Sequence, residues 1–488
     1  MMMLETGKKT KKIFIKDIVR VVFVLWISYG LIWGVLIFSK AKEVSQSYKD
    51  TSSVDQFYSH QMGSDRAIII DDPLDSGLAR LKIIQDAKET LDISYFAIHS
   101  GESADLFFGA LFEAADRGVQ VNIILDGIFH GLKKDLRDVL YALIAHPNTN
   151  LKFYEPMNLW MPWTLNNRLH DKYIIADRKI VIIGGRNIGD QYFAPNGYEE
   201  AITNDRDIII INTDMSEKSS VLFQLSEYFS LIWNHPYAKT RGNRILKNQY
   251  ERGLKKGEEL KNKFCNARDE HINFLKGDMD WLSLSMPTNK VTLIHNPVQR
   301  FSKEPWCWYE ITQLMKNAKK TVFIQSPYVI PNSQIVEGFF NQEDIANIEV
   351  TLLTNSLGST PNFPAYSGYM KYRKDIIDAG IRLYEYQGID SIHAKAFVID
   401  DDLTLIGSFN LDPRSAYLST ETMVVIHSIE VAQKFEEGIN PYFINSLVVT
   451  PDYTYNIEEK EKEQDVSQIK KILITTLSYI TRLFDYML

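Results

Sequence analysis

LHDKYIIAD, residues 169–177, occurs a second time in similar form as IHAKAFVID, residues 392–400. Each stretch places a lysine two residues after a histidine, and an apolar run and an aspartate follow. The two histidines, His170 and His393, are 223 residues apart. Because alternate side chains of a strand point to one face, each histidine would share a face with its lysine. The repetition predicts a structural unit that is present twice.

The sequence around both stretches extends the repeat to one longer motif, H-x-K-x4-D-x6-G-[GS]-x-N. The first copy consists of His170, Lys172, Asp177, Gly184, Gly185 and Asn187. The second copy consists of His393, Lys395, Asp400, Gly407, Ser408 and Asn410. The alternative, two unrelated histidines hydrogen-bonded at strand edges, leaves the equal spacing unexplained. We therefore expect both copies to serve one function.

Two further pairs of segments match between the halves of the chain. Residues 85–98 correspond to residues 316–330, and both indicate the end of a helix followed by a strand. Residues 106–126 and 368–386 each show apolar residues at helical spacing, then a glycine, then an apolar strand. Repeated helix–glycine–strand units predict α/β lobes with covered sheets. So long a repeat predicts two homologous lobes rather than a solenoid.

The N-terminal region contains an apolar segment, residues 18–38, in which Arg20 is the one charged residue. A helix of this length crosses a hydrocarbon core of about 30 Å. The run is longer than that of a usual signal peptide and no A-x-A-like site follows it, which favours an uncleaved anchor over a cleaved signal. Basic residues precede it at Lys8, Lys9, Lys11, Lys12 and Lys16. The positive-inside rule then predicts a single-pass cell-membrane protein with its main part on the extracytoplasmic side.

The chain divides by composition into seven parts. We expect a basic N-terminal segment (1–17), a transmembrane helix (18–38), a linker (39–65), a first lobe (66–245), a charged connecting segment (246–290), a second lobe (291–450) and a tail (451–488). The tail has a charged stretch and then an amphipathic helix that is too polar to span a membrane. This helix either lies on a membrane surface or docks on the second lobe.

The overall composition excludes some classes of function. The chain has 488 residues, 45% of them apolar and 24% charged, as in an ordinary globular protein. Its net charge of −8 argues against nucleic acid as a partner. Cys265 and Cys307 lie outside any metal-binding pattern, so we expect no metal site, and the sequence leaves open whether they pair.

The residue types of the motif suit chemistry at a phosphate. Histidine acts as a nucleophile or as an acid and base near neutral pH. Lysine and asparagine are donors to phosphoryl oxygens. If a pseudo-twofold axis related the lobes, the two histidines would lie on opposite sides of one phosphorus. That geometry suits in-line displacement, in which one histidine attacks and the other protonates the leaving oxygen.

The paired motif resembles the phospholipase D superfamily, in which two such motifs form one metal-independent active site. The resemblance covers about residues 75–450 and is closer still to the bacterial cardiolipin synthase branch. The characteristic segments are residues 168–193, 352–360, 368–386 and 405–421. The resemblance implies an α/β fold of two homologous lobes, each a mixed β-sheet flanked by helices and related by pseudo-twofold symmetry. It also implies that no cofactor is needed.

The resemblance further implies a role for each site residue. His170 would form a phosphatidyl-histidine intermediate, and His393 would protonate the leaving group and then deprotonate the acceptor alcohol. Either histidine could in principle be the nucleophile. The expected phosphate-binding residues are Lys172, Lys395, Asn187, Asn410 and Ser408. The expected histidine-orienting carboxylates are Asp207 and Glu421.

Two aspartates and one glycine of the motif have expected roles that differ from those above. Asp177 and Asp400 belong to the motif and are candidate catalytic residues, but their place between two strands indicates mainly a turn-shaping role. Gly185 stands where many members of the superfamily have serine, which removes one phosphate donor from the first copy.

The resemblance implies a membrane-anchored phosphatidyltransferase. It would make cardiolipin from phosphatidylglycerol and a second phospholipid, which is phosphatidylglycerol again or phosphatidylethanolamine. An alternative is a phospholipase D that uses water as the acceptor. A nuclease is a third interpretation, which the acidic net charge and the apolar anchor argue against. The motifs leave the acceptor open.

Overall fold

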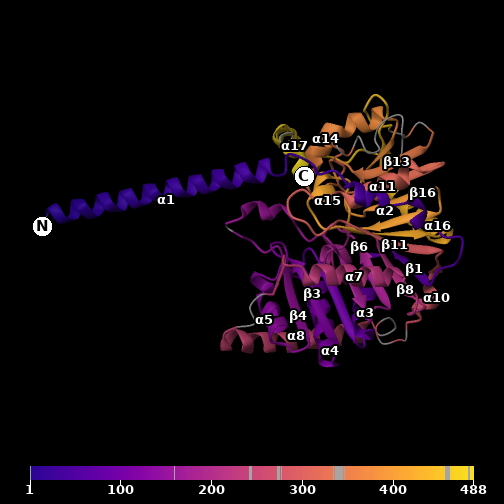
Figure 1. Cartoon of the computed structure of the whole chain (residues 1–488), viewed down its shortest axis with the longest axis horizontal. Helices are drawn as coiled ribbons and strands as arrows, with labels where there is room; N and C mark the ends of the chain where they lie inside the picture. Colours follow the sequence, from indigo (N-terminus) through magenta and orange to yellow (C-terminus); the bar gives the residue numbers. More distant parts are fainter. Residues whose placement is uncertain are drawn as a thin grey trace.

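A long N-terminal helix projects from a body of two lobes in the computed structural model of the chain (Figure 1). The structure describes residues 2–158, 160–240, 245–271, 275, 277, 279–332, 335, 345, 347–456, 462–481 and 484–488. The first lobe and the second lobe each contain one large β-sheet. The predicted α/β class with two sheet-containing lobes is therefore confirmed.

The projecting helix is α1 (Met2–Leu36), which runs through both the predicted basic segment and most of the predicted span. Its part from Lys16 to Gly34 is long and apolar enough to cross a membrane, with a mean hydropathy of 1.6, and none of it is buried. After the helix ends, Phe38 is buried in the second lobe. The predicted span of residues 18–38 thus overlaps the exposed part of α1, and its last residue belongs to the body.

The first sheet has the strand order β10-β1-β8-β6-β5-β2-β3-β4-β9. These strands are β10 (Met286–Pro287), β1 (Asp65–Ile70), β8 (Asp207–Asn212), β6 (Ile180–Gly184), β5 (Tyr173–Ala176), β2 (Thr90–Tyr95), β3 (Gln120–Asp126), β4 (Thr149–Tyr154) and β9 (Ala238–Thr240). Strands β2, β3 and β4 are parallel and the other neighbours are antiparallel, so the sheet is mixed.

The second sheet repeats the same plan in the order β11-β18-β17-β16-β12-β13-β14-β19. These strands are β11 (Lys290–His295), β18 (Thr422–His427), β17 (Leu403–Gly407), β16 (Ala396–Ile399), β12 (Thr321–Gln325), β13 (Glu349–Asn355), β14 (Arg382–Tyr386) and β19 (Ser446–Val448). Strand for strand, the order and the directions match those of the first sheet from β1 to β9. The equal topology confirms that the lobes are homologous, whereas their pseudo-twofold relation stays a prediction.

Strand alternation divides the apolar side chains into three layers. On β5, Ile174 packs in the outer core of the first lobe, whereas Tyr173 and Ile175 pack in the core between the lobes. On β16, Phe397 and Val398 divide in the same way between the outer core of the second lobe and the shared core. Because both faces of each sheet are covered, the motif strands β5, β6, β16 and β17 are almost entirely apolar.

Helices cover the outer faces of both sheets and fill the layer between them. The outer face of the first lobe carries α3 (Pro73–Asp86), α4 (Glu102–Asp116), α5 (Arg137–Ala145) and α8 (Lys247–Glu270). The layer between the lobes contains α7 (Val221–Asn234) and α16 (Ile429–Ile444). The outer face of the second lobe carries α11 (Trp306–Lys316), α14 (Phe363–Asp378) and α17 (Gln468–Thr481).

Short elements complete the described part of the chain. They are α2 (Gln46–Thr51), η1 (Val54–Phe57), η2 (Lys134–Leu136), η3 (Pro162–Asn166), α6 (Asp190–Phe193), β7 (Thr203–Asn204), α10 (Trp281–Leu284), β15 (Ser391–Ile392), α15 (Pro413–Tyr417) and η4 (Asp485–Met487). Strands β7 and β15 pair with each other and so join the two lobes.

The connecting segment is not solvated on all sides, because α8 packs one face against α4 and α5. Gly109 on α4 meets this helix closely. A Cβ atom at Gly109 would lie 2.3 Å from the carbonyl oxygen of Leu260 and 2.8 Å from Cβ of Phe264. Gly257 on α8 also faces this interface, but its added Cβ would meet only Ala142 Cβ, at 3.9 Å.

This difference predicts opposite effects of one methyl group. Gly109→Ala should lower the free energy of unfolding by about 1–3 kcal/mol, because backbone must move to admit the methyl group. Gly257→Ala should be neutral or stabilise by up to about 1 kcal/mol, since alanine is favoured over glycine inside a helix. Denaturant unfolding of the detergent-solubilised chain measures both. Equal effects of the two substitutions would contradict this packing.

Candidate active site

The two motif histidines lie where the lobes meet. His170 comes shortly before β5 in the first lobe, and His393 shortly before β16 in the second. The backbone N–H of His170 donates to Thr420 Oγ1 of the other lobe at 3.0 Å. The N–H of His393 donates to the carbonyl oxygen of Asn204, also across the boundary, at 2.6 Å. Each histidine is therefore attached to the lobe that does not contain it.

The carboxylates beside the histidines also come from the opposite lobes. Glu421 of the second lobe contacts Nδ1 of His170 with both oxygens, at 2.9 and 3.0 Å. Asp205 of the first lobe contacts Nδ1 of His393 at 2.5 Å. Both carboxylates are fully buried, whereas the side chains of His170 and His393 are 15% and 11% exposed. An Nδ1–H that donates to a carboxylate leaves Nε2 as the atom available for chemistry.

The motif lysines are buried beside the histidines. Lys172 Nζ donates to the carbonyl oxygen of His170, and Lys395 Nζ donates to that of His393. Burial lowers the pKa of Lys172 to about 7 and that of Lys395 to about 8, although nearby carboxylates act in the opposite direction. The charges of Glu421 and Asp205 each act on both lysines. The motif residues of the two lobes thus form one electrostatic cluster.

Both imidazoles are neutral at neutral pH in this environment. Burial, followed by the charges of Lys172 and Lys395, holds the pKa of His170 well below its usual range. Burial and the charge of Lys395 lower the pKa of His393 to about 4. A phosphodiester between them would bring a negative charge that offsets the lysines and favours an imidazolium. The arrangement can therefore offer one neutral imidazole as nucleophile and, once an anion is bound, another as acid.

The motif asparagines and Ser408 differ in their contacts. Asn187 Nδ2 donates to the hydroxyl of Tyr192 at 3.2 Å, and its Oδ1 accepts from the N–H of Ala97 at 3.3 Å. Asn410 is buried, and its Oδ1 has no hydrogen-bond partner among the described residues. Ser408 Oγ donates to Glu421 at 2.5 Å. This hydrogen bond places Ser408 at the carboxylate that contacts His170, and its expected role as a phosphate donor stays a prediction.

The assignment of Asp207 as a histidine-orienting residue is wrong. Its carboxylate forms buried ion pairs with Arg80 at 2.9 Å and with Arg186 at 2.7 Å. Although burial acts to raise it, these two guanidinium groups lower the pKa of Asp207 to about 2. The structure instead places Asp205 at His393.

Strand register explains why the neighbouring aspartate takes this position. Gly184 of the first motif pairs with Asp207, and Gly407 of the second motif pairs with Met423. The equivalent of Glu421, two residues before Met423, is therefore Asp205. Two aspartates two residues apart point to the same face of a strand, so the residue pattern alone does not distinguish them.

The assignment of Asp177 and Asp400 as catalytic is also corrected. Asp177 accepts hydrogen bonds from the backbone N–H groups that lead into β2, and Asp400 accepts the equivalent three before β12. Both have positive φ, 54° and 51°, which aspartate tolerates in a tight turn. They lie at the far ends of β5 and β16 from the histidines, so they fix the hairpin turns.

The first motif has glycine in place of serine for a steric reason. A Cβ atom at Gly185 would lie 2.5 Å from both carboxylate oxygens of Asp205. At the equivalent place in the other lobe, Ser408 contacts the longer Glu421. The first lobe therefore uses glycine with aspartate where the second uses serine with glutamate.

Aromatic residues that the sequence pattern did not single out surround the histidines. The ring of Phe96 lies 5.2 Å from that of His170, and Phe129, which is half exposed, lies 5.2 Å from Phe96. Tyr192 and Tyr328 flank His393 at 5.7 and 6.3 Å. Phe96 and Tyr328 lie in the matching segments 85–98 and 316–330, but nothing in the sequence places these aromatic residues beside the histidines, because the segments meet only in the fold.

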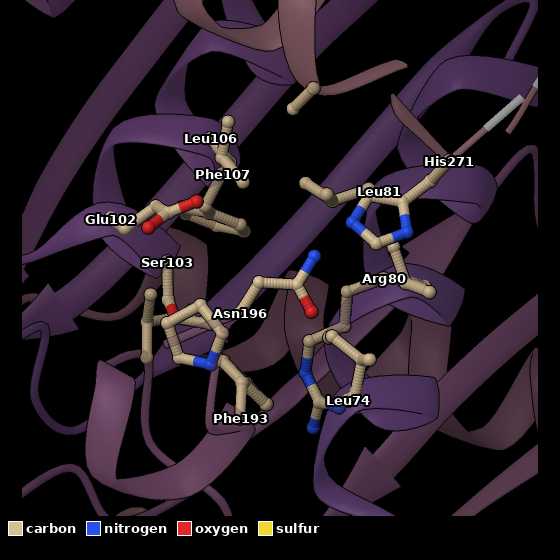
Figure 2. Close-up of a pocket in the computed structure, with 15 residues that line it drawn as sticks. Leu74, Arg80, Leu81, Glu102, Ser103, Leu106, Phe107, Phe193, Asn196 and His271 are labelled. Carbon is tan, nitrogen blue, oxygen red and sulfur yellow. The ribbon is translucent and has the colours of Figure 1, made fainter. Parts of the chain in front are cut away.

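A separate cavity lies on the outer side of the first lobe, between α3, α4, α6 and α8 (Figure 2). Its volume of about 40 Å³ suits only one or two water-sized molecules. Arg80, the partner of Asp207, lines it together with apolar residues such as Leu106 and Phe107. None of the motif histidines or lysines lines this cavity, so we do not regard it as the active site.

Known proteins agree with this architecture. The structure of phosphatidylserine synthase from Haemophilus influenzae superimposes with a TM-score of 0.59, at 14% identity, over 86% of this chain and 95% of its own, which supports the fold. A Helicobacter pylori protein named only as uncharacterized is 30% identical over 410 residues, which are 75% of this chain and 77% of that protein. Cardiolipin synthase C of Escherichia coli is 28% identical over 75% of this chain and 82% of its own length.

Two homologous lobes that share one site of paired histidines and lysines define a protein of the phospholipase D superfamily. The family described as cardiolipin synthase, PLD-like domain, matches residues 81–233 and 311–441, and the chain belongs to this family. The predicted superfamily is thereby confirmed. The relatives of this chain support its assignment as a phospholipid phosphatidyltransferase. The N-terminal apolar helix suggests that the chain is anchored in a membrane.

The two aspartates before β8 should respond differently to loss of charge. Asp205→Asn should lower phospholipid turnover roughly a hundredfold to ten-thousandfold with little change in stability, because it disturbs the tautomer of His393. Asp207→Asn should instead destabilise the fold by about 3–5 kcal/mol, since it leaves two buried guanidinium groups short of a partner. Turnover and denaturant unfolding of both variants separate the roles. A stable Asp207→Asn variant together with an active Asp205→Asn variant would refute the assignment.

The hydrogen bond from Ser408 to Glu421 predicts how a substitution changes the pH dependence of activity. Burial raises the pKa of Glu421 to about 7, while Lys172 and the Ser408 hydrogen bond oppose the rise. Because Ser408→Ala removes a donor to the carboxylate, it should raise this pKa further, by roughly half a unit to one unit. Activity that depends on the carboxylate is lost as pH falls through that pKa, so the acid limb of the pH–rate profile should move to higher pH. Ser216→Ala, on an exposed turn, is the control, and an unmoved limb in Ser408→Ala would contradict the coupling.

Proposed function

We propose that this chain is a membrane-anchored phosphatidyltransferase that makes cardiolipin from phosphatidylglycerol and a second phospholipid. The observation that supports it is the pairing of His170 with Glu421 and of His393 with Asp205 across the lobe boundary. Because Nδ1 of each histidine contacts a carboxylate, its Nε2 atom is available to react with a substrate. Two buried lysines supply positive charge for a phosphodiester. The family match supports a phospholipid as the molecule that contains this phosphodiester.

In the first step, Nε2 of neutral His170 attacks the phosphorus of phosphatidylglycerol. A P–N bond forms and the P–O bond to the glycerol headgroup breaks. His393, as an imidazolium, gives its proton to the leaving glycerol oxygen, and Glu421 stabilises the positive charge that develops on His170. Lys172, Lys395 and the amide of Asn410 would stabilise the charge on the phosphoryl oxygens.

In the second step, a hydroxyl group of the acceptor attacks the phosphorus while His393 accepts its proton. The P–N bond breaks and His170 returns to its neutral form. With a second phosphatidylglycerol as acceptor, the products are cardiolipin and the glycerol released earlier. With phosphatidylethanolamine as the second phospholipid, it is instead the donor in the first step: its phosphatidyl group is transferred to His170, ethanolamine leaves with the proton of His393, and a hydroxyl of phosphatidylglycerol is the acceptor. The low exposure of both histidines supports transfer over hydrolysis, because it limits the access of water to the intermediate.

The two lobes are proposed to lie on the extracytoplasmic side of the membrane. The basic residues before the apolar part of α1 would keep the N-terminus in the cytoplasm, so both lobes would face the extracytoplasmic side. The substrate would then be taken from the outer leaflet of the membrane in which α1 is inserted.

The products distinguish transfer from hydrolysis. We expect the full chain, reconstituted in phosphatidylglycerol vesicles, to yield cardiolipin and glycerol, which lipid mass spectrometry and a glycerol assay detect. Parallel vesicles with added phosphatidylethanolamine test the second lipid. Phosphatidic acid without cardiolipin in both would overturn the transferase proposal and favour a hydrolase.

Substitution of the histidines tests the shared site. His170→Ala and His393→Ala should each lower cardiolipin formation at least about a thousandfold, because each removes a partner that the other does not replace. His146→Ala, a surface histidine of the first lobe paired with Asp116, should keep normal turnover. Near-normal activity of either motif variant would be incompatible with one site built from both lobes.

A further inference from the structure

The C-terminal helix α17 leaves an apolar stripe exposed although it is docked on the body. Ile469, Ile472, Leu473 and Ile480 are all exposed, and Ile472 retains 65% of its accessible surface. Their spacing of three, four and seven residues places them on one side of the helix. Tyr479 extends the same side. An exposed stripe of this kind marks an interaction surface.

The opposite side of α17 fixes its orientation on the second lobe. Ile474, Ser478 and Thr481 are buried there, and Thr481 Oγ1 accepts a hydrogen bond from Ser367 of α14 at 3.2 Å. Lys470 donates to the carbonyl oxygens of Gly358 and Thr360, at 3.1 and 3.3 Å. Docking on the lobe, one of the two arrangements expected from the sequence, is thus observed. Because this side is held, the apolar stripe cannot turn inward.

The helix lies in the part of the body from which α1 emerges (Figure 1). Phe38, two residues after α1, belongs to the same buried cluster as Ile474 of α17. Trp163 of η3 packs against this cluster and also contacts Tyr29 of α1, with ring centroids 5.7 Å apart. The end of α1 and the η3 loop therefore adjoin each other, and α17 lies on the second lobe, on the side from which α1 emerges in Figure 1.

The exposed groups of this region match the chemistry of a lipid–water interface. Trp160, next to η3, is 84% exposed, and tryptophan is enriched at membrane interfaces. Lys471 is exposed beside the stripe, where an ammonium group can reach anionic headgroups. A protein partner would leave unexplained why these groups gather next to a helix that is apolar enough to cross a bilayer.

We propose that α17 lies in the surface of the bilayer that α1 crosses, with its stripe of Ile469, Ile472, Leu473 and Ile480 in the headgroup region. This proposal rests on the membrane anchor of the proposed function and adds a second attachment point to it. One helix alone permits the whole molecule to tilt in the bilayer. Two attachment points restrict that tilt and hold the shared site at a constant height above the lipids.

A fluorescent probe tests where the stripe lies. The full chain with Cys265→Ser offers no other exposed thiol, because Cys307 is fully buried. A nitrobenzoxadiazole label is placed at Ile472→Cys, and the protein is reconstituted in vesicles of phosphatidylglycerol and phosphatidylcholine. Part of the phosphatidylcholine bears a nitroxide on its acyl chain. Leu31→Cys in α1 is the positive control, and Ile429→Cys is the matched exposed isoleucine, 60% exposed, on α16 at the opposite end of the body (Figure 1).

We expect the label at residue 472 to emit at shorter wavelength in vesicles and to be quenched by the nitroxide lipid, approaching the label at residue 31. The label at residue 429 should show neither change. Quenching at residue 31 but not at residue 472 would overturn the α17 proposal and leave the anchor intact. A shift to shorter wavelength at residue 472 without quenching would mean that protein covers the stripe, which also overturns it. Absence of quenching at residue 31 would instead refute the membrane anchor, and the α17 proposal with it.

Discussion

The interaction on which the rest of the structure depends is the crossed pairing of histidines with carboxylates. His170 is held by Glu421, and His393 by Asp205, so each lobe supplies the partner of the other lobe's histidine. Neither lobe contains a complete site. The β7–β15 pair and the backbone bonds of both histidines keep the lobes in the one relative position that permits these contacts. The duplicated motif and the shared apolar core are consequences of this requirement.

The same pairing balances charge in a buried region with little access to solvent. Lys172 and Lys395 oppose Glu421 and Asp205, and all four side chains are buried. With both histidines neutral, the cations and the carboxylates balance one another, and a lipid phosphodiester then adds one negative charge. That charge favours the protonated form of one histidine when substrate is bound. The buried ion cluster therefore couples binding of an anion to the appearance of an acid, which a solvated cluster would do much less effectively.

Much of this architecture could be predicted from the sequence. The spacing of the two motifs indicated the duplication, and the apolar runs before Asp177 and Asp400 indicated paired buried strands. The apolar segment after Lys16 indicated a helix able to span a membrane. The site was predicted less completely. The residue pattern alone does not distinguish Asp205 from Asp207, because the choice between them depends on strand register. The contact of Ser408 with Glu421 likewise depends on how distant segments meet. The sequence does not place the aromatic residues beside the histidines for the same reason.

The sequence by itself determined which groups are present and how they are spaced along each strand, since a two-residue period decides which side chains share a face. It therefore determined that His170 and Lys172 act together, as do His393 and Lys395. Only the tertiary structure decided which carboxylate faces which histidine and which side of α17 is left exposed. Those choices depend on how the lobes pack across their shared core, where one residue of register or one buried arginine determines the partner of each charged group.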